Sequence, residues 1–176
     1  EVNQAKVNTP LFFEIDTSLT KASENKLIFR FDELNSDSLF KKYRKKDLKN
    51  IKTKSIKIIN DVYEIGLIEE NYDFKDNQLT SIILNNKLIK SLYFERLIKP
   101  KNLLLFINNK IIEYEVEEFK SQIVSLVFDI IKPNLIFDDK LSNQAINEAT
   151  INISPNRGLV EKETLIRSKG EIVEGE

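Results

Sequence analysis

Apolar residues recur at three- and four-residue intervals along residues 38–65, and this periodicity constrains the fold more than any other feature of the chain. Ser36 and Asp37 are suitable N-cap residues before it, and Gly66 follows as a typical C′ residue. The pattern predicts one long helix, or two helices joined near Thr53. Its apolar positions are Phe40, Tyr43, Leu48, Ile51, Ile58, Val62 and Ile65.

A second amphipathic helix is predicted over residues 116–131, centred on Ile123. Pro133 disfavours helical geometry at Lys132 and is expected to end this helix there. We expect the Ile123-centred helix to pack against the helix that ends at Gly66. The apolar face is made by Val116, Phe119, Ile123, Val127 and Ile130.

Shorter segments have the composition of strands and turns. Residues 11–15 and 27–31 are aromatic and β-branched runs, which predict two short strands. Asn85-Asn86 lies between two apolar runs over 80–93 and predicts a hairpin, because asparagine tolerates positive φ. Pro100 is expected to open a short helix that Asn108-Asn109 ends, followed by a strand over 110–114.

The last third of the chain predicts one more helix and a β tail. Asp138 or Asp139 can cap a helix with a small apolar face at Leu141, Ala145 and Ala149, and Ser154-Pro155 then breaks it. The sequence therefore predicts an α+β fold of helices packed on short strands. Residues 1–153 would form the main domain and residues 154–176 a small C-terminal β element of the same domain.

Composition excludes most catalytic classes. The 176 residues include no histidine and no cysteine, so the common proton shuttle, the thiolate nucleophiles and the usual zinc ligands are all missing. We predict no catalytic residue, no cofactor and no metal site. A carboxylate-dependent hydrolase is the one common class left, but no acidic spacing matches a calcium loop. The candidate acids are Glu113, Glu115, Glu117, Glu118, Asp138 and Asp139.

A basic run over residues 41–57 is the strongest local charge. It could face phosphates or anionic surfaces, which makes a soluble binding module the alternative function. The formal net charge of −1 offers no global attraction for nucleic acid, so a solvated helix face is favoured and no nucleic-acid partner is expected. The run consists of Lys41, Lys42, Arg44, Lys45, Lys46, Lys49, Lys52, Lys54 and Lys57.

The chain contains no methionine and begins at Glu1. Its longest apolar stretch, Ile123 to Ile131, is far shorter than the roughly 20 residues that span a bilayer. We therefore expect a segment of a longer protein whose membrane anchors lie outside this sequence.

Three C-terminal motifs carry a resemblance to a known family. They are Lys132-Pro133-Asn134-Leu135-Ile136-Phe137-Asp138-Asp139, then Ile153-Ser154-Pro155-Asn156-Arg157-Gly158-Leu159-Val160, then Ile166-Arg167-Ser168-Lys169-Gly170-Glu171-Ile172-Val173. Their order and spacing resemble the end of the extracellular domain of bacterial seven-transmembrane HD-hydrolase receptors. Tyr63-Glu64-Ile65-Gly66-Leu67-Ile68 is similar to a helix-ending segment of the Bacteroidetes-type members.

The resemblance implies a non-catalytic sensor or ligand-binding domain on the extracytoplasmic side of the inner membrane, either periplasmic or at the cell surface. The parent chain would be embedded in the membrane and carry a separate cytoplasmic HD domain, a metal-dependent phosphodiesterase that hydrolyses cyclic di-AMP. The partner would be an extracytoplasmic ligand or protein. The motif residues, structural or ligand-binding, are Pro133, Asn134, Asp138, Pro155, Arg157, Gly158, Gly170 and Glu171; Arg157 could anchor a ligand or shape a turn.

Overall fold

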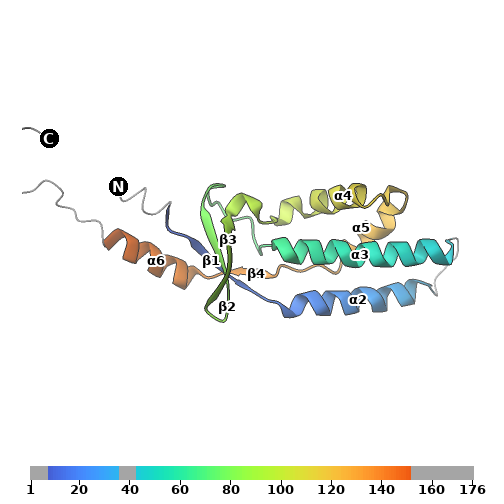
Figure 1. Cartoon of the computed structure of the whole chain (residues 1–176), viewed down its shortest axis with the longest axis horizontal. Coiled ribbons are helices and arrows are strands. Elements are labelled where there is room, and N and C mark those ends of the chain that lie inside the picture. Colours follow the sequence, from blue (N-terminus) through green and yellow to red (C-terminus); the bar gives the residue numbers. More distant parts are fainter. Residues whose placement is uncertain (1–7, 36–42, 152–176) are drawn as a thin grey trace, which may run out of the picture.

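A four-stranded sheet lies between a bundle of helices and one further helix (Figure 1). The computed structural model describes residues 8–35 and 43–151. Within them, helices α2 to α5 run side by side away from one side of the sheet, and α6 projects from the other side. The long axis of the molecule therefore runs from α6 through the sheet to the far tip of the helical bundle.

The sheet has the strand order β3-β2-β1-β4, with the first strand in its interior. Strand β1 spans Leu11–Ile15 and pairs in parallel with β2, Leu79–Leu84. It pairs antiparallel with the short β4, Leu135–Phe137. Strand β3, Lys87–Tyr93, forms the hairpin partner of β2 and lies at the opposite edge.

The helices account for most of the described residues. Their bounds are α2 Ser18–Asn35, α3 Lys45–Ile65, α4 Leu103–Glu113, α5 Lys120–Phe128 and α6 Asp139–Ile151. Three 3₁₀ turns accompany them: η1 Phe94–Arg96, η2 Pro100–Asn102 and η3 Glu117–Phe119.

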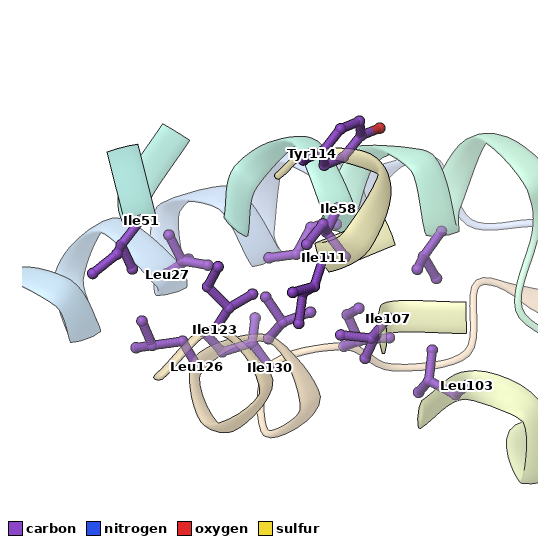
Figure 2. Packing of buried hydrophobic residues seen from close by; sticks show 14 of the residues in the cluster. Leu27, Ile51, Ile58, Leu103, Ile107, Ile111, Tyr114, Ile123, Leu126 and Ile130 are labelled. Carbon is purple, nitrogen blue, oxygen red and sulfur yellow. The ribbon is translucent and has the colours of Figure 1, made fainter. Parts of the chain in front are cut away.

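The bundle has its own hydrophobic core, to which α2, α3, α4 and α5 all contribute (Figure 2). The buried positions recur at helical spacing on each helix, so each presents one apolar face to the centre. Labelled examples in Figure 2 are Leu27 from α2, Ile51 and Ile58 from α3, Leu103, Ile107 and Ile111 from α4, and Ile123 and Leu126 from α5.

A second, smaller core lies on one face of the sheet. Phe13 of β1 is fully buried there and contacts the rings of Tyr72, Phe94 and Phe137. The helices thus pack mainly on one another, while loop residues cover this face of the sheet. This arrangement is α+β, as predicted, but with two adjoining cores.

Several local predictions are confirmed. Strand β1 has the predicted bounds. Helix α3 continues through Thr53 as one helix and stops at Gly66, whose φ is 106°. The β2–β3 hairpin turns at Asn85 and Asn86, with φ of 50° and 61°, the positive pair that a type I′ turn requires. The predicted start of α3 is wrong, because Tyr43 and Arg44 are not helical and α3 begins at Lys45. The predicted N-caps Ser36 and Asp37 lie outside the described residues.

The strand predicted over residues 27–31 is wrong, because these residues belong to α2. Ser23, Leu27 and Phe31 are spaced by four residues and all are buried against the bundle. Asp16 sets the start of this helix, since its carboxylate accepts hydrogen bonds from the Ser18 amide and hydroxyl. Burial across the bundle outweighs the local strand preference of the aromatic run.

The short helix after Pro100 is longer than predicted. Helix α4 passes through Asn108-Asn109 and ends at Glu113, so the strand predicted over residues 110–114 is wrong. Burial of Leu103, Ile107 and Ile111 on one stripe holds the helix through the two asparagines. The chain reverses after it at Glu115, which has a φ of 54°.

The predicted helix over 116–131 is also corrected. It begins with the 3₁₀ turn η3, and α5 ends at Phe128, before Pro133 can act on it. Ile130 and Ile131 remain buried in the following turn, so the apolar pattern outlasts the helix. The sequence prediction also missed β4, a strand of three residues.

Candidate functional site

The junction between the bundle and the sheet is formed by short extended segments that are joined by parallel β-bridges. Leu67 bridges to Ile98, and Ile68 bridges to Leu135. Leu67 and Ile98 lie in the bundle core, whereas Ile68 and Leu97 lie in the sheet core. Because successive side chains of extended backbone point to opposite sides, these short segments join the two cores.

Asn134 is the polar centre of this junction. Its side chain is 1% exposed and accepts a hydrogen bond from the Leu67 amide at 2.8 Å, while its amide group donates to the Tyr63 carbonyl at 3.2 Å. Its backbone carbonyl also accepts from the Asp16 amide at 2.9 Å. One residue therefore fixes the end of α3, the start of β4 and the loop that follows β1.

Two further features define the end of α3: the lack of space beside Gly66 and hydrogen bonds from Lys90. A Cβ atom on Gly66 would lie 2.3 Å from Cδ1 of Leu135, so a larger residue does not fit beside β4. Lys90 of β3 donates hydrogen bonds to the carbonyl oxygens of Glu64 and Ile65. A cation at this position also suits the negative end of the helix dipole.

Asp138 connects the sheet to α6. Its carboxylate accepts a hydrogen bond from the Leu141 amide at 2.8 Å, which confirms the predicted helix cap. Ser142, one turn into α6, is 1% exposed and its hydroxyl accepts from the Phe12 amide of β1. The first strand and the last described helix are thereby held side by side.

The other predicted motif residues are only partly placed. Pro133 is half-buried next to Asn134 and follows α5 by a short turn. Pro155, Arg157, Gly158, Gly170 and Glu171 lie outside the described residues, as do the predicted β element over 154–176 and the domain boundary at 153. The roles of these residues remain predictions.

A groove on the outer side of α4 and α5 is the candidate ligand site. Its volume is roughly 710 Å³, which lies within the range of about 300–1,000 Å³ common for small-molecule sites. Small polar side chains leave this space open where the two helices could otherwise interdigitate. The lining residues are Leu104, Asn108, Glu117, Glu118, Lys120, Ser121, Val124 and Ser125.

The sequence prediction missed this groove. Leu104 and Asn108 lie one turn apart on α4, and Ser121 and Ser125 lie one turn apart on α5. A stripe of serine beside the apolar stripe of Ile123 was the available signal. It identifies a helix flank, but only the fold shows that α4 faces it.

Some lysines of the basic run over 41–57 contact other side chains of the bundle. Lys57 lies 4.1 Å and Lys54 5.2 Å from the ring centroid of Tyr114, and Lys52 pairs with Asp32 at 3.5 Å. Lys41 and Lys42 lie outside the described residues. The absence of a nucleic-acid partner remains a prediction.

Tyr114 lies at the α3–α4 contact, close to these lysines. Its hydroxyl donates a hydrogen bond to the Asp61 carboxylate. Burial, and then this hydrogen bond, raise the pKa of Tyr114 well above its ordinary value. The phenol therefore stays protonated and links the two helices.

Residues 8–35 and 43–151 contain no group of three or more acidic side chains that could hold a metal ion. In the same part of the chain, every helix is too short or too polar to cross a bilayer.

Comparison with known proteins gives one match. A family model described as 7TM-HD extracellular matches residues 2–176. No curated protein and no solved structure matches the chain.

Proposed function

Because the chain belongs to the family of 7TM-HD extracellular domains, it is an extracytoplasmic sensory domain of a membrane receptor, and we propose that it regulates a cytoplasmic HD domain that hydrolyses cyclic di-AMP. The chain itself is non-catalytic in this proposal. It contains no histidine, whereas HD sites hold their metals with histidine and aspartate. The similarity of Tyr63–Ile68 to Bacteroidetes-type members supports a receptor of that type.

One structural observation carries the proposal: the route from the bundle to both ends of the described chain. Strand β1 begins and α6 ends on the side of the sheet away from the bundle tip (Figure 1). The Phe12 amide donates a hydrogen bond to the Ser142 hydroxyl, and the Asp138 amide donates one to the Phe12 carbonyl at 2.9 Å. A displacement of the bundle therefore reaches both ends together.

The Asn134 junction supports the same route. A ligand that binds one arrangement of the bundle more tightly than another shifts the population toward it. Since Asn134 bonds to the end of α3 and to the loop after β1, that shift reorients the sheet as well. The coupling free energy between the two sides is then set by how firmly this junction holds.

The test uses the full-length receptor in membranes and measures cyclic di-AMP hydrolysis. We compare the wild type, a form in which a flexible linker replaces residues 8–151, and the Asn134→Ala variant. The deletion is expected to change the rate or its regulation, and Asn134→Ala to reproduce part of that change.

Asn71→Ala is the matched control, because Asn71 is an exposed loop residue, whereas Asn134 is buried. It should hydrolyse cyclic di-AMP as the wild type does. Equal rates and equal regulation in the wild type and the deletion would refute the proposal.

A further inference from the structure

We propose that the groove between α4 and α5 binds a small organic amine: an ammonium group carried on a short apolar chain. That the amine acts as a signal rests on the proposed function. Binding of the amine does not, because it can be measured on this domain alone. The groove has three kinds of lining, and each selects one feature of such a ligand.

One residue that lines the groove has an unsatisfied hydrogen-bond acceptor. The Oδ1 atom of Asn108 is buried and has no hydrogen-bond partner, although the side chain lines the groove. A buried carbonyl oxygen without a donor is costly, so a protein that retains one has a reason outside its own packing. An N–H donor from a ligand satisfies this oxygen.

The walls favour an apolar chain. Leu104 of α4 is 46% exposed, and Val124 of α5 is only partly buried across from it. A chain of a few methylene groups laid between them removes apolar surface from water. Ser121 and Ser125 keep the groove wide enough to admit it.

The end of the groove favours a positive charge. Glu117 and Glu118 lie where η3 leads into α5, and both line the groove. Neither forms an ion pair within 4 Å among the described residues. Lys120 lowers the local negative charge. Arg44 also interacts electrostatically with Glu118, but its own ion pair with Asp47 offsets its charge, so an excess of one carboxylate remains and an ammonium is preferred over an anion.

Binding is coupled to the separation of the two helices. The Asn108 oxygen is nearly closed to solvent, so a ligand that seats a donor against it must widen the groove. Glu115 lies in the connection between α4 and η3 with a φ of 54°, a conformation that costs a non-glycine residue free energy. This strained connection lies two and three residues before the groove carboxylates Glu117 and Glu118.

The experiment titrates the purified chain, residues 1–176, with pentylamine and follows binding by calorimetry and Tm. Pentylamine is expected to bind saturably and raise Tm, while 1-pentanol and pentanoate bind at least about tenfold more weakly, because each lacks the charged donor. Leucylglycinamide distinguishes a peptide N-terminus from a free amine as the source of the ammonium. Equal binding of amine, alcohol and acid would overturn the proposal.

Variants locate the site. Asn108→Leu removes the unpartnered oxygen, so we expect an equal or higher Tm without ligand but about tenfold weaker amine binding. Ser125→Leu fills the groove from an exposed position and should abolish binding without unfolding the bundle. The double variant Glu117→Gln and Glu118→Gln should weaken binding, whereas Glu33→Gln, an exposed acid on α2, should not.

Unchanged affinity in Ser125→Leu and in the glutamine double variant would reject the groove as the site. This outcome is independent of the hydrolysis assay. If the extracellular domain regulates hydrolysis but does not bind the amine, only the ligand proposal is refuted. Amine binding without any regulation would sink the receptor proposal alone.

Discussion

At the scale of single residues, Asn134 shows how one side chain can hold segments far apart in the sequence. Its partners Tyr63 and Leu67 are 71 and 67 residues away, and both hydrogen bonds are buried. A buried amide that meets two backbone groups fixes their separation and their direction. Replacing it leaves those groups without partners.

We expect Asn134→Ala to lower the free energy of unfolding by about 2–4 kcal/mol, because the Leu67 amide and the Tyr63 carbonyl lose a buried partner. Urea unfolding followed by circular dichroism measures this. Asn71→Ala, on an exposed loop, should change stability by less than about 0.5 kcal/mol. Similar losses in the two variants would contradict the role given to Asn134.

Gly66→Ala should destabilise the domain by about 2–4 kcal/mol, through its positive φ and the overlap of the new Cβ with Leu135. The double variant with Leu135→Ala separates these causes. In that background the overlap is gone, so adding Gly66→Ala should cost less. An equal cost in both backgrounds would leave backbone strain as the sole cause.

At the scale of elements, some local signals predict where an element ends or turns, but Asn108-Asn109 does not, since α4 continues through it. Gly66 and Asn85-Asn86 stop or turn the chain through their own backbone preferences, and the structure confirms both. The run over 27–31 has no such signal. Its apolar residues fit a strand or a helix, and packing of Leu27 and Phe31 in the bundle decides for the helix.

In the candidate site, too, local contacts could be predicted from the sequence and long-range contacts could not. Asp138 caps α6 through a hydrogen bond three residues away, which sequence reasoning can anticipate. Asn134 belonged to a recognised motif, but its partners lie across the fold and no local pattern names them. The α4–α5 groove depends on two helices facing each other, so it too required the tertiary structure.

In the β2–β3 turn, we expect two substitutions of the same residue to change the free energy of unfolding in opposite directions. Asn86→Gly should stabilise the domain by about 0.5 kcal/mol, because glycine adopts positive φ without a Cβ penalty. Asn86→Ala should destabilise it by about 1 kcal/mol. Thermal unfolding of both variants is the measurement, and a shared sign would exclude the type I′ explanation.

The hydrogen bonds at the start of α2 should make the stability of the domain depend on pH. Hydrogen bonds from the Ser18 hydroxyl and amide lower the pKa of Asp16 below its ordinary value. A carboxyl whose pKa is lowered on folding stabilises the fold above its unfolded pKa of about 3.9, and this contribution is lost as pH falls through the lower folded pKa.

We therefore expect Asp16→Asn to lose less stability than the wild type between about pH 5 and pH 2.5. Ser18→Ala, which keeps the carboxyl but removes the hydroxyl, should also flatten the curve. Unfolding midpoints across this range provide the test. Wild-type slopes in both variants would show that the hydrogen bonds do not control this titration.

At the scale of the whole molecule, the bundle and the sheet share one junction between two cores. Leu67 and Ile68 are neighbours in the chain but belong to different cores. The two halves should therefore open together. A receptor domain built this way transmits a change in its bundle without first losing its sheet.

Native-state hydrogen exchange tests this cooperativity. In the wild type, core amides of α3, such as Ile58, and of β2, such as Ile82, should exchange with the same opening free energy. In Asn134→Ala the β2 amides should open at a lower free energy than those of α3. Two distinct opening energies already in the wild type would mean that the cores are independent.

The pairing of β1 with β4 also has a consequence for biogenesis. Residues 11–15 find their antiparallel neighbour only at 135–137, so the edge strand β4 cannot join the sheet before that stretch has been exported. Helices α2 to α5 precede this strand and share their own core, but the sheet core lacks Leu135 until nearly all of the domain has crossed the membrane. We expect nascent chains shorter than this to require chaperone protection outside the cytoplasm.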